Sequence, residues 1–161
     1  MKKPGFLSKL KADSKLKLVE SSEEICSSYM EKADKCLKSA KILLQNDLYE
    51  NSVSMSYYAM YNSLTALLFK TGIKCENHAG SIILLKRVFG KVELFKIISF
   101  AKEERIDKQY YVTSEENFVL TRESAKDMVE KTEDFLVKTK LIITELKNEE
   151  IENIRLEFDK I

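Results

Sequence analysis

Apolar positions recur at intervals of three and four residues over most of this chain. This spacing is typical of amphipathic helices, and we find no run with the strict alternation of a half-buried strand. The pattern predicts helices over about 21–47, 48–70, 79–104 and 121–147. Because only a few residues join the first two, these should pack as an antiparallel pair. We therefore expect an all-α protein, an up-down helical bundle of four to five helices.

The second predicted helix has its residues sorted by size. A line of small residues runs along it beside a line of larger ones at the same spacing. The small line is Ser52, Ser56, Ala59, Ser63 and Ala66, and the larger line is Val53, Tyr57, Met60, Leu64 and Leu67. Small residues let a neighbouring backbone approach closely, so this helix should lie at the centre of the bundle. Gly72 follows in the position of a left-handed helix terminator.

The ends of the other elements are less sharply marked. Ser21–Glu24 has the form of a capping box and indicates a helix start. Gly90 interrupts the third helix and is compatible with a kink or with two short helices. Residues 105–116 are polar and predict a loop. The charged tail, 148–161, could extend the last helix or form a short one of its own.

The first twenty residues carry six lysines against two acidic residues. Their apolar positions keep only a loose helical period, which favours a flexible or partly helical basic arm. A surface for RNA or an acidic partner is the alternative, and the broken apolar face disfavours membrane anchoring. We divide the chain into this basic arm (1–20), a helical bundle (21–147) and a charged tail or helix extension (148–161).

Composition constrains the class of protein more than its function. With four glycines and one proline in 161 residues, the chain should form one helical domain, and its net charge of +1 gives no overall attraction for nucleic acid. No run has the length of a transmembrane helix and the N-terminus lacks an apolar signal core, so we expect a cytoplasmic protein without membrane contact. Cys26, Cys36 and Cys75 lack a CxxC pattern and should be free thiols. Without a phosphate-binding glycine loop or a zinc spacing, neither cofactor nor metal is expected.

The run from Leu48 to Tyr61 resembles the signature of HEPN-domain proteins, in which a phrase of the type Y-x-x-A-V-S-x-x-Y-Y-A-M-F opens the second helix. Further similarities follow in order, at Ala66-Leu67-Leu68, Gly72, His78-Ala79-Gly80, Arg105 with Tyr110-Tyr111, and Glu123–Phe135. The resemblance covers about residues 31–138. It implies an all-α bundle that commonly forms a homodimer. It also implies pairing with a minimal nucleotidyltransferase in a toxin–antitoxin-like system.

Active members of the family that this chain resembles are metal-independent ribonucleases with an arginine followed four to six residues later by a histidine. The guanidinium stabilises phosphate charge while the imidazole moves the proton of the 2′-hydroxyl. Here His78 is the only histidine and precedes all four arginines, and Tyr110 stands five residues after Arg105. A phenol with a pKa of about 10 is a poor general base at neutral pH.

The resemblance therefore favours a binding and interaction module that contacts a nucleotide or RNA and works with a nucleotidyltransferase. Two alternatives stay open. One is a metal-independent ribonuclease toxin that uses Arg105, the only catalytic candidate, with a degenerate motif. The other is a structural helical adaptor without a ligand.

The candidates for nucleotide or RNA contact are His78, Ser81, Arg105, Asp107, Tyr110 and Tyr111. His78 and Ser81 stand at the start of a predicted helix, whose exposed amides suit a phosphate. Alternatively, His78 is a loop or helix-start residue that bonds local backbone. Arg105 and Asp107 could instead form a surface ion pair.

The tyrosines fall into two groups. Tyr57 belongs to the larger line of the second helix, which favours a core position with a hydrogen-bonded hydroxyl. Tyr58 and Tyr61 share another face, which could be core or dimer interface. Tyr110 and Tyr111 are candidate pocket walls, stacking platforms for a base or targets of the partner transferase.

Overall fold

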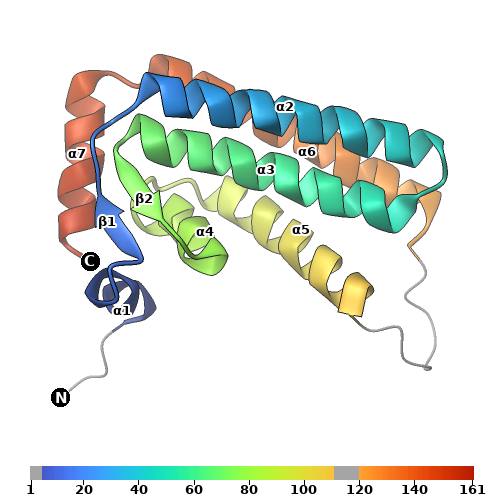
Figure 1. Cartoon of the computed structure of the whole chain (residues 1–161), viewed down its shortest axis with the longest axis horizontal. Helices are drawn as coiled ribbons and strands as arrows, with labels where there is room; N and C mark the ends of the chain where they lie inside the picture. The colour runs from blue at the N-terminus through green and yellow to red at the C-terminus, as the bar shows by residue number, and fades with distance from the viewer. Residues whose placement is uncertain (1–4, 111–119) are drawn as a thin grey trace.

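A computed structural model of the chain describes residues 5–110 and 120–161, and for residues 106–110 it describes the backbone alone. The elements in chain order are α1 (Phe6–Ala12), β1 (Leu16–Leu18), α2 (Glu23–Gln45), α3 (Tyr49–Lys70), β2 (Ile73–Cys75), α4 (His78–Arg87), α5 (Val92–Tyr110), α6 (Arg122–Glu145) and α7 (Asn148–Asp159). The long helices α2, α3 and α6 run along the long axis, with α5 inclined against α3 (Figure 1). The prediction of an all-α helical bundle is confirmed.

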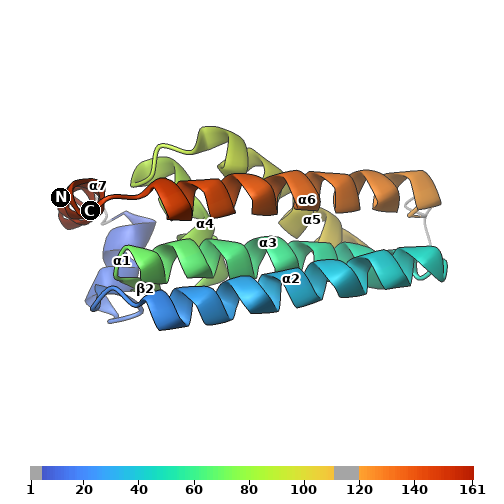
Figure 2. The same ribbon diagram turned by 90° about the horizontal axis from the view of Figure 1, so that it is seen from above.

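The first two long helices form the predicted antiparallel pair. The Ser22 hydroxyl caps α2 by accepting a hydrogen bond from the Ile25 amide at 3.1 Å. After α2 the chain reverses through Asp47, which has a φ of 59°. Figure 2 shows α3 lying between α2 and α6. Helix α3, the second of the helices predicted from sequence, is therefore the central element of the bundle.

Both lines of residues along α3 are buried, with exposed fractions of 1% or less. The small line allows the close approach that its composition predicts, because the Ser52 hydroxyl donates to the Ala40 carbonyl of α2 at 2.8 Å. Ala33 and Ala40 of α2 are themselves fully buried. The packing of α2 on α3 thus depends on small side chains on both helices.

The structure has a short pair of strands for which the sequence shows no strand pattern. β1 and β2 pair antiparallel, with Leu16 opposite Cys75 and Leu18 opposite Ile73. Three-residue strands are too short to show an alternating pattern. Within the first twenty residues, Leu7 and Leu10 of α1 are buried in the core together with Leu16.

The expected loop over 105–116 is wrong for its first part, because α5 continues to Tyr110. No glycine or proline follows Ala101 in the sequence, so no helix-breaking residue ends the helix at 104. At Gly90, with a φ of 65°, the chain forms two separate helices rather than a kink. The tail forms a helix of its own, α7.

Helix α7 crosses the end of the bundle and packs beside the N-terminal segment (Figure 1). Its Phe158 is buried, and the Ser8 hydroxyl of α1 donates to the Ile161 carbonyl at 3.0 Å. Arg155 Nη1 donates to three carbonyls at 3.0 to 3.1 Å, those of Val19, Thr71 and Gly72. The Ser8 hydrogen bond joins the two ends of the described chain, and the Arg155 contacts fix α7 to the segments that follow β1 and precede β2. Of the described helices, none combines the length and the apolar character that a bilayer crossing needs.

Candidate functional site

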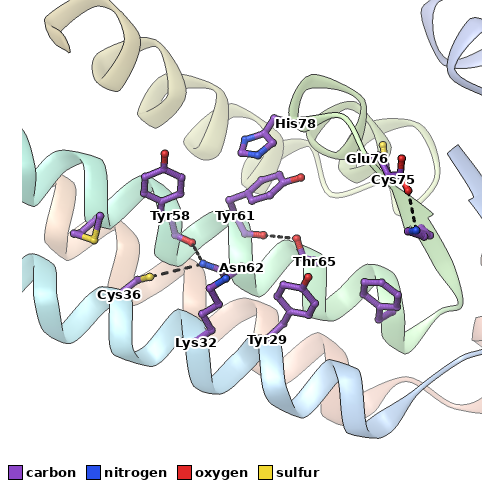
Figure 3. A pocket seen from close by; sticks show the side chains of 13 residues that line it. Tyr29, Lys32, Cys36, Tyr58, Tyr61, Asn62, Thr65, Cys75, Glu76 and His78 are labelled. Atoms are coloured by element: carbon purple, nitrogen blue, oxygen red, sulfur yellow. Dashed lines mark hydrogen bonds and ion pairs between the residues drawn. The ribbon is translucent and has the colours of Figure 1, made fainter. Parts of the chain in front are cut away.

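His78 is held in place by two tyrosines of α3. It is the first residue of α4, whose start is fixed because the Asn77 side chain accepts a hydrogen bond from the Gly80 amide at 2.8 Å. His78 Nδ1 is hydrogen-bonded to the Tyr57 hydroxyl at 2.9 Å. Its ring also stacks on Tyr61, with centroids 3.7 Å apart and ring planes 14° apart (Figure 3). The imidazole is thus fixed in position and orientation.

Arg105 of α5 lies against the same group of tyrosines. Its guanidinium carbon is 5.2 Å from the ring centroid of Tyr57 and 4.8 Å from that of Tyr58. These are cation–π distances, and the two ring faces position the guanidinium. Arg105 Nε is buried without a hydrogen-bond partner in the part of the chain that is described. Arg105 and His78, far apart in sequence, therefore contact one tyrosine; we call this the Arg–His centre (Tyr57, His78 and Arg105).

The protonation states at this centre follow from burial and charge. Burial lowers the pKa of His78 below its usual value, and the positive charges of Arg105 and Lys102 lower it further. Burial raises the pKa of Tyr57. At neutral pH the centre thus combines a neutral imidazole, a protonated phenol and a fixed cation. A guanidinium can bind a phosphate while a neutral imidazole accepts or passes a proton.

The titration of His78 can be measured directly, because it is the only histidine in the chain. We expect its imidazole NMR signals to titrate below the usual pKa of 6.5, and Arg105→Gln to raise this pKa, since the Arg105 charge disfavours the imidazolium. The neutral imidazole's contribution to stability is complete above pH 6.5 and is lost as the pH falls through that value toward the folded-state pKa.

Arg87→Gln is the control for the His78 titration, because it removes an exposed cation at the end of α4 that is not among the charges acting on His78. A pKa at or above 6.5, or one that both variants move equally, would contradict the described centre.

The structure brings together three of the sequence-predicted site residues. His78 and Arg105 meet at Tyr57, and the buried Ser81 hydroxyl lies 3.4 Å from the Tyr61 hydroxyl. The side chains of Asp107 and Tyr110, and all of Tyr111, lie outside the described residues. His78 bonds a side chain of α3 through Nδ1, which sequence alone did not indicate.

A groove of about 390 Å³ opens beside the centre, between α2, α3 and the β2–α4 segment (Figure 3). We call it the aromatic groove; its lining includes Tyr29, Lys32, Tyr58, Tyr61, Phe69, Lys74, Glu76 and His78. Tyr58 and His78 belong both to this lining and to the surroundings of Arg105. Among the described residues, no group of three or more His, Cys, Asp or Glu side chains could hold a metal ion.

Comparison with known proteins agrees with this architecture. The sequence model of the HEPN domain matches residues 26–142. A UPF0332 protein of Thermotoga maritima is 32% identical over 130 residues, which cover 78% of this chain and 96% of that protein. A Methanocaldococcus jannaschii protein named "Putative toxin MJ0142" is 33% identical over 116 residues, covering 69% of this chain and 76% of that one. A second protein of that organism, "Putative toxin MJ0605", is 31% identical over 122 residues, covering 73% and 87%.

Proposed function

This chain belongs to the HEPN domain family, and on that premise we propose that it is one half of a toxin–antitoxin-like pair that binds a nucleotide or RNA at the Arg–His centre. The observation that carries the proposal is the meeting of the Arg105 guanidinium and the His78 imidazole at Tyr57. Two relatives whose names describe toxins support the toxin role. We propose a minimal nucleotidyltransferase as the partner protein and a homodimer as the assembly.

The centre suits a phosphate in both charge and geometry. Arg105 is only partly buried, so the edge of its guanidinium can reach a ligand while Tyr57 and Tyr58 hold its faces. Guanidinium N–H groups bind phosphate oxygens in a two-pronged arrangement. Neutral His78 can add a hydrogen bond without a second positive charge. The same pair of groups serves for binding, with or without cleavage.

A ribonuclease is the second candidate function, favoured by the position of His78 beside Arg105. In the family motif the histidine follows the arginine in sequence, whereas here it comes from α4. Cleavage requires a ring nitrogen that can take the proton of a 2′-hydroxyl. When His78 Nδ1 donates to the Tyr57 hydroxyl, Nε2 is free to act as that base. When the hydroxyl donates to Nδ1, Nε2 carries the proton and can only donate.

Binding of a labelled single-stranded RNA, measured by fluorescence anisotropy, tests the proposal. Arg105→Gln should weaken binding about 10- to 100-fold, because it removes a charge-assisted contact to phosphate. Arg87→Gln, a change of equal charge on the exposed end of α4, should leave binding within about twofold. Equal losses in both variants would show general electrostatic attraction, and no binding by the wild-type chain would favour the structural adaptor.

The same RNA, incubated with chelator and run on a gel, separates the two functions. Cleavage that is lost in His78→Gln while binding persists would identify the ribonuclease. Binding without cleavage would identify the interaction module. The partner is tested separately, by whether a nucleotidyltransferase co-purifies with the tagged chain from its native cells.

A further inference from the structure

The walls of the aromatic groove carry two stacked pairs of rings. Tyr29 of α2 and Phe69 of α3 stack with centroids 5.7 Å apart and planes 7° apart. Toward the Arg–His centre, Tyr61 and His78 form the second pair. All four side chains line the same cavity. Flat aromatic surfaces are the usual platforms for unpaired bases. The cavity volume of about 390 Å³ is in the range of small-ligand sites.

Lysines lie at and beside the rim of this groove. Lys17 of β1 and Lys74 of β2 are direct cross-strand partners, so their side chains lie on one face of the ribbon. Like charges placed in this way repel. Lys74 lines the groove, and Lys32 lines it from α2. Glu76 already pairs with Lys74, and an anion bound at the rim would compensate the remaining positive charge of Lys17 and Lys32.

Glu76 is the acidic group among the described lining residues, and it is already paired. Its carboxylate lies 2.7 Å from Lys74 Nζ. The pKa of Glu76 is lowered first by Lys74 and then by Lys17 and Lys15, which places these lysines within electrostatic reach of the groove. The cations around the groove therefore outnumber its carboxylate. This charge is suited to a phosphate and disfavours a second copy of the same lysine-bearing surface.

We propose that the aromatic groove holds one unpaired nucleotide, with its base stacked on the aromatic walls and its phosphate at Lys17, Lys32 and Lys74. The inference rests on the proposed function, because Tyr58 and His78 join the groove to the Arg–His centre. A strand of RNA would then place one nucleotide in the groove and an adjacent phosphate at Arg105. The same chemistry also fits a free mononucleotide.

Anisotropy with a labelled single-stranded RNA decamer tests this groove in the full chain. Tyr29→Leu should weaken binding about tenfold, because it keeps apolar bulk but removes the stacking face. Tyr49→Leu, at the opposite end of α3, is the matched control and should change binding less than about twofold. Lys17→Gln with Lys74→Gln should reduce the slope of log affinity against log salt by about 0.7, the value for one phosphate of a single strand. Lys126→Gln with Lys160→Gln is the charge control; these two exposed lysines lie on α6 and just after α7.

The outcomes separate this inference from the proposed function. Loss of binding in Arg105→Gln but not in Tyr29→Leu would overturn the groove and leave the proposed function standing. The reverse result would support the groove and overturn the Arg–His centre as the ligand site.

Competition by adenosine monophosphate that depends on Tyr29 would identify a free nucleotide as the ligand of the groove. The absence of such competition would assign the groove to an RNA strand. Equal binding of duplex RNA, or no binding of any probe, would overturn the inference. A melting temperature for each variant excludes unfolding as the cause.

Discussion

Replacing Gly72 with alanine is expected to lower the free energy of unfolding by about 3 kcal/mol or more. Gly72 has a φ of 70°, a conformation that costs an alanine about 1–2 kcal/mol. The added Cβ would also lie 2.5 Å from the Val19 carbonyl oxygen and against Arg155 Nη1. The Val19 backbone has little freedom to move, because its amide donates to the Gly72 carbonyl at 2.8 Å. Thermal unfolding should show a fall of roughly 6–12 °C for a chain of this size.

Gly90→Ala is the matched control for this prediction. Gly90 has nearly the same conformation, with a φ of 65°, but apart from its chain neighbours no heavy atom of the described residues lies within 4 Å of the position of an added Cβ. Its substitution should therefore cost only the conformational part, about 1–2 kcal/mol. The difference in the free energy of unfolding between the two variants measures the steric cost of a methyl group at the contact of β1, α3 and α7 around Gly72. Equal destabilisation would show that this corner can relax.

The central helix could be predicted from sequence because its periodicity and its burial agree. The two lines of small and larger residues along α3 are buried as expected, and Gly72 takes the left-handed conformation predicted for it. Such signals are local, since each residue's neighbours at three and four positions lie on the same face of a helix. The β1–β2 pairing was not predictable in this way. It joins residues almost sixty positions apart, and its strands have three residues each.

The Arg–His centre was only half predictable. His78 and Arg105 could be selected as chemically capable residues, but the family motif directs attention to a histidine after the arginine. The structure places His78 at Tyr57 because Asn77 starts α4 there, and it places Arg105 at the same ring because α5 packs against α3. Both facts depend on tertiary packing. The sequence feature that could have indicated this contact is the tyrosine in the core line of α3, because a buried tyrosine hydroxyl needs a hydrogen-bond partner.

Tyr57→Ala is expected to lower the free energy of unfolding by about 3–5 kcal/mol, because it removes a large aromatic side chain from the core. Tyr57 has an exposed fraction of 0% and packs beside Tyr58, Tyr61 and His78. The loss should also release Arg105, whose guanidinium rests on the Tyr57 ring. Denaturant unfolding measures the first effect. Tyr49→Ala, a tyrosine at the end of α3 with its hydroxyl bonded to Asp47, should cost about 1 kcal/mol or less.

Tyr57→Phe separates the structural role of this ring from its role at the centre. It keeps the core filled and retains the ring face on which the Arg105 guanidinium rests. We therefore expect the free energy of unfolding to fall by about 1 kcal/mol, the value of one hydrogen bond. RNA affinity should stay within about twofold, because Arg105 keeps its position. His78 loses its Nδ1 partner, so any cleavage that depends on its orientation should fall while binding persists. If Tyr57→Phe instead abolished binding, the ligand would depend on the orientation of His78 that this hydroxyl fixes, and the Arg105 guanidinium would not be sufficient to hold the phosphate.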